Sequence, residues 1–173
     1  MSNLLAQLPG FIGLFFLVLS FQQNNRNRIL IWILAGQLFF ILHFVMIGAW
    51  TGVGMNIVGI SRTIVFRFRE ERRWADLPFW PWLYPVLFML AGVIAWEAWY
   101  SLLPSVAMSV ESVGLWMKRP SRIRFINLFP HPLWFTYNVI KGSYPGMITE
   151  ILVLASILVA IWRYDIRKKP EVG

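Results

Sequence analysis

Ionisable and amide side chains occur inside the most apolar stretches of this chain. Arg62, Glu111 and Glu150 place formal charges there, and His43 and Asn56 add hydrogen-bonding groups. A charged group at the centre of a lipid bilayer costs about 2.5–3.5 kcal/mol even on lenient insertion scales, so such groups face a bundle interior or a wet cavity. These residues therefore predict a polar site enclosed between helices.

Arg62 and Glu111 have opposite charges at similar depths in their stretches, which favours an ion pair because pairing removes most of the desolvation penalty. The pair can hold two helices together, or it can act in gating or substrate binding; the sequence leaves these roles open, and also the absence of a contact. Polar groups set in apolar walls suit small organic solutes. The predicted substrate-binding residues, which we expect to line an outward-opening cavity, are His43, Asn56, Arg62, Glu111, Trp134, Tyr137, Asn138 and Glu150.

The same residues do not indicate a metal or catalytic centre. One histidine with one glutamate lacks a third metal ligand, and the absence of cysteine excludes disulfides, thiolate catalysis and cysteine-based metal sites. An acid–base pair of His43 or His131 with Glu150 has no nucleophile to serve, and an interhelical hydrogen bond is the simpler role for each histidine. We expect no metal, no cofactor and no enzymatic activity.

The composition indicates an all-α integral membrane protein. Hydrophobic residues make up 58% of the 173 positions, charged residues only 14%, and the mean hydropathy is +0.60. Apolar runs of about 17–20 residues recur between short polar breaks, and each can cross about 30 Å of hydrocarbon as a helix. They predict seven transmembrane helices at residues 5–22, 28–47, 50–68, 78–97, 101–117, 122–141 and 145–163.

Basic residues alternate along the chain with these predicted spans. The net charge is +8, and fourteen of the sixteen Lys and Arg residues lie in the odd-numbered connections, at the span ends beside them or after the last span. The positive-inside rule then places the N-terminus outside and the C-terminus in the cytoplasm. The basic charge is thus a topology signal and a contact with anionic lipid. The expected partners are the bilayer and a small solute but no nucleic acid, and a homodimer is left open.

An internal repeat emerges when the sequence is shifted by 94 positions, which places Gly48 over Gly142 and Asn56 over Glu150. Either the matching residues coincide by chance at loop edges, or two three-helix bundles are joined by the fourth span in a 3+1+3 arrangement. A single linker span gives both halves the same orientation, which makes the repeat parallel. The predicted units are a first bundle at 1–73, the linker helix at 74–99, a second bundle at 100–169 and a cytoplasmic tail at 170–173.

Two motifs also carry a family resemblance. The segments GMNIVGISR, which ends at Arg62, and WFTYNVIKGSYPGMITE, from Trp134 to Glu150, resemble the bacterial inner-membrane YgjV family. That family is similar to the SWEET sugar transporters, PQ-loop proteins and the KDEL receptor, which are built from paired three-helix bundles. The resemblance implies this fold and a location in the inner (plasma) membrane, but no established substrate.

Prolines inside the predicted spans add a signal about mechanism. The segment FPHP places Pro130 and Pro132 around His131 near mid-membrane, where missing amide donors break or kink a helix. The kink is either static or a hinge for alternating access. With the repeat and the buried polar set, it favours a small-solute transporter whose two halves move around a central site. The alternative is a non-transporting membrane receptor or assembly protein with the same fold.

Overall fold

The computed structural model describes residues 2–21, 26–117 and 119–166, which form helices joined by short connections and contain no β-strand. The all-helical prediction is therefore confirmed for this part of the chain, and the predicted tail at 170–173 lies outside it. The α-helices are α1 (Ser2–Phe21), α2 (Arg26–Met46), α3 (Trp50–Phe68), α4 (Trp80–Ile94), α5 (Leu102–Trp116), α6 (Pro120–Asn127), α7 (Pro130–Lys141) and α8 (Tyr144–Ile161). Short 3₁₀ turns, Arg73–Asp76 and Trp99–Ser101, precede α4 and α5, and a π turn, Trp162–Ile166, follows α8.

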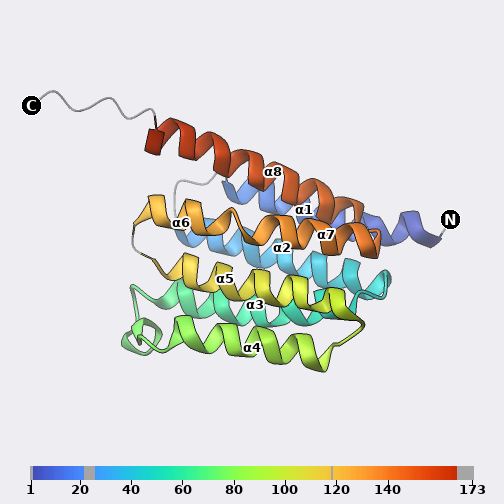
Figure 1. Ribbon diagram of the computed structural model, residues 1–173, viewed down its shortest axis with the longest axis horizontal. Helices are drawn as coiled ribbons and strands as arrows, with labels where there is room; N and C mark the ends of the chain where they lie inside the picture. Colours follow the sequence, from blue (N-terminus) through green and yellow to red (C-terminus); the bar gives the residue numbers. More distant parts are fainter. Residues whose placement is uncertain (1, 22–25, 118, 167–173) are drawn as a thin grey trace, which may run out of the picture.

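The described helices run back and forth along one axis, with α6 and α7 following each other in a single pass (Figure 1). Counted in this way, the described chain makes seven passes, and its two termini lie at opposite ends. We call the end that carries the turns at Gly48 and Gly142 the glycine end. The opposite end, which carries Arg72 and Arg73 in the α3–α4 connection, is the basic end.

The predicted spans agree closely with the helices, and the fourth differs most. Span 50–68 is α3 without an offset, whereas span 78–97 shortens to α4. α4 stops early because the chain turns away at Ala95, whose carbonyl accepts a 2.7 Å hydrogen bond from Thr51 Oγ1 of α3. A tertiary contact that local hydropathy does not encode thus sets this boundary.

A break before Pro130 divides the sixth pass into α6 and α7, as the FPHP segment predicts. The amides of Leu128 and Phe129 donate to carbonyls three residues back, at 3.4 and 3.2 Å, in the tighter 3₁₀ pattern. Pro130 begins α7, where its missing N–H removes no helical bond, and Pro132 lies in the same first turn. A hinge at this break remains a prediction.

Two runs of neighbouring helices surround the interior. α1 packs on α2 and α2 on α3, while α5 packs on α6 and α7, and α7 on α8. Contacts of α1 with α8 and of α3 with α5 join the two runs. α4 packs against α3 and α5, where Gly92 brings its backbone against the Ser105 hydroxyl. The interior therefore lies between all passes except α4.

The two turns at the glycine end have the same backbone geometry. Gly48 has a φ of 67° and Gly142 a φ of 65°, in the left-handed region that favours glycine. In each turn the next amide, of Ala49 or Ser143, donates to the carbonyl five residues back, at 2.8 and 2.9 Å. These are the positions that the shift of 94 residues superimposes.

Large apolar side chains cover much of the outer surface. Ile94 is 85% exposed, Leu4 74% and Trp82 69%, although contiguous apolar surface is rare on proteins that face water. Among the described helices, α8 is long and apolar enough to span a membrane, and Leu4–Ser20, Ile31–Met46 and Trp80–Ile94 are shorter apolar segments. Lipid is the solvent that such a surface fits.

Candidate functional site

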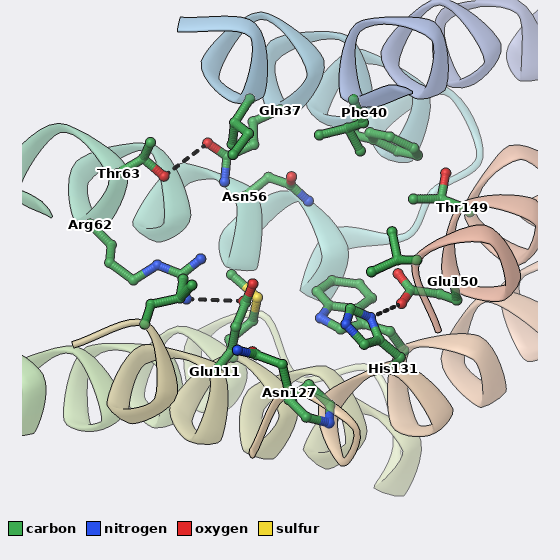
Figure 2. Close-up of a pocket in the computed structure, with 18 of the residues that line it drawn as sticks. Gln37, Phe40, Asn56, Arg62, Thr63, Glu111, Asn127, His131, Thr149 and Glu150 are labelled. Atoms are coloured by element: carbon green, nitrogen blue, oxygen red, sulfur yellow. Dashed lines mark hydrogen bonds and ion pairs between the residues drawn. The ribbon is translucent and has the colours of Figure 1, made fainter. Parts of the chain in front are cut away.

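A cavity of about 450 Å³ occupies the interior and is lined by every described α-helix except α4. Its volume falls within the range of about 300–1,000 Å³ typical of small-molecule sites. Its wall is largely apolar, and the polar residues that interrupt it are arranged around the open space (Figure 2). The polar residues of the wall labelled there are Gln37, Asn56, Arg62, Thr63, Glu111, Asn127, His131, Thr149 and Glu150.

An ion pair between Arg62 of α3 and Glu111 of α5 lies on one side of the cavity (Figure 2). Arg62 Nη1 donates to Glu111 Oε2 at 3.0 Å and to Ser112 Oγ at 3.1 Å. The Arg62 side chain is 5% exposed, and its Nε has no hydrogen-bond partner. Because buried donors are normally paired, Arg62 retains unused capacity to bind a ligand.

A second pair, His131 of α7 with Glu150 of α8, lies on another side of the cavity (Figure 2). His131 Nδ1 and Glu150 Oε2 are 2.7 Å apart, and each side chain is 14% exposed. At this distance an imidazole and a carboxyl group share one proton, which can reside on either of them. Within the described ranges, no three His, Asp or Glu side chains come together as metal ligands.

Two amide side chains add neutral polar groups to the wall. Asn56 Nδ2 donates to Gly52 O within α3 at 2.9 Å, which leaves its side-chain oxygen available. Asn138 is 1% exposed, and its Oδ1 has no hydrogen-bond partner. Gly146 of α8 lies so close to this amide that a Cβ atom would overlap it. Both amides can therefore bond a polar ligand.

Aromatic rings form part of the apolar wall. The rings of Phe44 and Trp134 stack with centroids 6.2 Å apart and planes inclined by 19°. Phe40 lies beside Phe44, at a centroid distance of 5.9 Å, and all three line the cavity. Such rings provide rigid surface for an apolar or planar group.

His43 and Tyr137 close the cavity at the glycine end, and both are fully buried. His43 of α2 bonds through Nε2 to Ser143 Oγ, before α8, at 2.8 Å and through Nδ1 to Ala6 O of α1 at 2.7 Å. The hydroxyl of Tyr137, on α7, accepts from Gly52 N–H near the start of α3 at 2.9 Å. Each side chain thus belongs to one run of helices and bonds near the start of a helix in the other run.

An ion pair covers the same end. Lys141 Nζ lies 3.1 Å from Glu97 Oε1 and donates to the carbonyl of the α2–α3 turn at 3.1 Å. Glu97 also accepts from Trp50 N–H at 2.8 Å. The two charged side chains are 15% and 12% exposed, so bulk water screens them little. We call His43, Glu97, Tyr137 and Lys141 the glycine-end seal.

The cavity is less enclosed toward the basic end. Leu17, Ile123 and Arg124 line it there and are partly exposed, whereas Phe44 and Asn138 near the glycine end are buried. The seal lies over the end with the glycine turns, and an outward opening at that end stays a prediction. The seal closes that end because its hydrogen bonds join helix ends that are distant in the sequence. The periodicity of the sequence does not predict such bonds.

The structure places most of the predicted site residues around the cavity. Its wall includes Asn56, Arg62, Glu111, Trp134, Asn138 and Glu150. His43 and Tyr137 belong instead to the seal, because their ring atoms bond to the helix starts. Pro130 lines the cavity, and Pro132 is not part of its wall. Solute binding by these residues remains a prediction.

Sequence reasoning missed other residues of the site. Gln37 and Thr63 line the cavity and bond to each other at 3.4 Å. The shift of 94 residues places Gln37 over His131, so the repeat contains a signal for its position. Glu97 and Lys141 carry no such signal, because the pair joins a connection to a helix 44 residues away.

Comparisons with known proteins identify a family. No curated protein and no solved structure matches the chain. The family model Imp-YgjV, described as bacterial inner membrane protein, matches residues 4–168. This range contains every residue that lines the cavity and supports an inner-membrane location. The chain therefore belongs to the Imp-YgjV family of bacterial inner membrane proteins.

Proposed function

We propose that this protein is a small-solute transporter that works by alternating access around the central cavity. In this proposal the seven passes cross the inner membrane, and α1–α3 and α5–α8 are the halves of a 3+1+3 parallel repeat of the SWEET type, joined by α4. The N-terminus lies outside, and the basic end faces the cytoplasm. The exposed apolar side chains of the outer surface then contact lipid.

The observation that carries the proposal is the cavity of about 450 Å³ with ionisable groups from both halves. Arg62 comes from the first half, and Glu111, His131 and Glu150 come from the second. A purely structural core gains little from such groups, because apolar packing stabilises a protein as well as a buried ion pair does. Charged residues around a space in the membrane interior are typical of transport pathways.

The contacts at the glycine end support the repeat. The shift of 94 residues superimposes His43 on Tyr137, and each of these side chains bonds near the start of the third helix of the other half. Reciprocal contacts of this kind are expected from two similar halves related by a two-fold axis. An axis at the cavity centre lets the halves rock around one site.

The two ends of the cavity differ as alternating access requires. The seal closes the glycine end, which the basic-residue pattern places outside, and the wall is less enclosed toward the basic end. The structure then corresponds to an inward-facing state. Opening the seal while closing the basic end would expose the same site to the other side.

Cysteine accessibility tests this sidedness, because the chain contains no cysteine. Val153 lines the cavity, so Val153→Cys reports on the interior. We expect a membrane-impermeant thiol reagent to modify it at least about tenfold faster from the cytoplasmic side of inverted vesicles than from the outer side of right-side-out vesicles. Trp50→Cys, 55% exposed at the glycine end, should react only from outside. Equal reaction of Val153→Cys from both sides would refute the sealed end.

Weakening the seal should increase access from outside. Lys141→Met removes the bonds to Glu97 and to the α2–α3 turn, and a loss of about 1.4 kcal/mol from the closed state raises the open population about tenfold. The measurement is the outer labelling rate of Val153→Cys in the Lys141→Met background. Arg72→Met, at the exposed basic end, is the matched control and should leave the rate unchanged. An unaltered rate in Lys141→Met would exclude a gating role for the seal.

The alternative, a non-transporting receptor or assembly protein, predicts a different result. Such a protein binds its ligand from one side only, and weakening the seal would loosen the fold without opening a path. A cavity that never becomes accessible from outside, in any seal variant, would favour this alternative.

A further inference from the structure

We propose that the solute is a small zwitterion with an apolar or aromatic side chain, such as an apolar α-amino acid. Its carboxylate binds Arg62, and its ammonium group binds Glu111. The inference rests on the proposed function for its site and adds the chemistry of the ligand. Three observations carry it: the unused edges of the Arg62–Glu111 pair, the charge balance of the cavity and the aromatic wall.

Arg62 has a free edge for a carboxylate. Nη1 makes the bonds to Glu111 and Ser112, whereas Nε is buried without a partner and Nη2 bonds no described residue. Nε and Nη2 form one edge of the planar guanidinium, and such an edge binds both oxygens of a carboxylate side by side once the wall that buries Nε shifts to admit the ligand. Figure 2 shows this guanidinium directed into the cavity, between Asn56 and Glu111.

Glu111 has a free oxygen for an ammonium group beside that edge. Oε2 accepts from Arg62, and Oε1 has no partner among the described residues. The Glu111 side chain is 25% exposed, compared with 5% for Arg62, and it lines the cavity. Donor edge and acceptor oxygen thus lie side by side. A carboxylate and an ammonium group on one carbon atom need this arrangement.

Charge balance favours a zwitterion over a simple ion. Arg62 and Glu111 neutralise each other, so a singly charged solute would add an uncompensated charge to a weakly polarisable interior. In the second pair, His131 Nδ1 and Glu150 Oε2 already bond each other at 2.7 Å. A zwitterion adds one charge of each sign and leaves the balance intact.

The aromatic wall of the cavity favours a solute with an apolar side chain. Phe40, Phe44 and Trp134 present aromatic surface to the cavity, and a volume of about 450 Å³ accommodates a molecule of amino-acid size. A sugar would place several hydroxyl groups against this aromatic surface, where a hydroxyl group without a partner loses its hydrogen bonds to water. An apolar or aromatic side chain instead gains by leaving water.

Equilibrium binding of L-phenylalanine to the purified full chain in detergent tests the ligand class. 3-Phenylpropionate lacks the ammonium group and phenethylamine lacks the carboxylate, so the two compounds are matched controls. We expect phenylalanine to bind at least about tenfold more tightly than either compound and to raise the melting temperature, whereas glucose should not. A compound with a single charge that binds as tightly as phenylalanine overturns the proposal.

Arg62→Lys distinguishes the contribution of the guanidinium edge to ligand binding from that of the positive charge. Lysine keeps the charge beside Glu111 but lacks the planar fork. Phenylalanine affinity should fall at least about tenfold. Arg69→Lys, in the Arg69–Asp76 pair outside the cavity, should leave it unchanged. Unchanged affinity in Arg62→Lys overturns the carboxylate assignment, and if this variant does not fold, the comparison of compounds on the unsubstituted protein decides.

Failure of the ligand class is distinguishable from failure of the transporter proposal. If phenylalanine and other apolar amino acids do not bind but Val153→Cys keeps its sided and seal-dependent reactivity, the zwitterion assignment is wrong and alternating access stands. If the sided reactivity is absent as well, the proposed function itself is wrong.

Discussion

Glu111→Ala should lower the free energy of unfolding by about 3 kcal/mol, because it leaves the Arg62 guanidinium buried without a counter-ion. Arg62 is 4% exposed, and Ser112 Oγ, at 3.1 Å, would be its remaining hydrogen-bond partner among the described residues. Removing one partner of a buried pair costs about 3–5 kcal/mol. The 25% exposure of Glu111 to the cavity places this pair at the lower limit. Reversible unfolding in mixed detergent micelles measures the change.

Two further variants separate the unpaired charge from the loss of a side chain. The double variant Arg62→Met/Glu111→Leu removes both charges and should recover most of the lost stability, since apolar replacement of a buried pair is often neutral. Asp76→Ala breaks the Arg69 pair, in which the aspartate is 60% exposed, and should cost less than about 1 kcal/mol. A double variant less stable than Glu111→Ala would contradict this explanation.

His43→Leu should lower the free energy of unfolding by about 2–3 kcal/mol and loosen the glycine end. The fully buried ring joins Ala6 O and Ser143 Oγ, at 2.7 and 2.8 Å. Leucine keeps the apolar contact with Phe40, whose ring centroid lies 6.2 Å away, but loses both bonds. Each bond contributes about 0.5–1.5 kcal/mol, and the Ser143 hydroxyl, which keeps the Gly146 amide as a donor to it, adds a desolvation cost for its unpaired O–H. Thermal unfolding gives the loss, and outer labelling of Val153→Cys gives the loosening.

Matched variants identify which bond of His43 matters. Ser143→Ala removes the bond to Nε2 and the helix cap that Ser143 Oγ forms with Gly146 N–H at 3.3 Å, and should cost about 1–2 kcal/mol. His43→Gln keeps an amide that can both donate and accept, and should recover part of the loss. If His43→Leu unfolds at the wild-type temperature, the seal does not depend on this ring.

Helix positions could be predicted because hydropathy and proline act locally. Span 50–68 coincides with α3, and the break in the sixth pass lies at Pro130, where the missing donor requires it. The end of α4 could not be predicted, because the Thr51 hydroxyl of another helix donates a hydrogen bond to the carbonyl of Ala95. Hydropathy in a window of residues contains no information about such a partner.

The candidate site could be predicted in part, for the same reason. Charged residues in apolar stretches must avoid lipid, so Arg62, Glu111 and Glu150 were expected to face the interior, and all three line the cavity. Their partners were harder to predict. Arg62 pairs with Glu111 as charge and depth indicated, whereas Glu150 bonds His131, and the sequence alone had left both His43 and His131 open as its partner. Side-chain reach and the break before α7 decide that choice.

Sequence patterns predict the helical class, the approximate limits of the passes, the matching glycine turns and the charged residues that face the interior. These properties depend on residue type within a short window: hydropathy, missing donors and the left-handed φ of Gly48 and Gly142. The packing of the passes selects which polar residues line the cavity and which belong to the seal. His43 and Tyr137 close one end because their ring atoms reach helix starts about 90 residues away in the chain, and such pairings depend on how the passes pack.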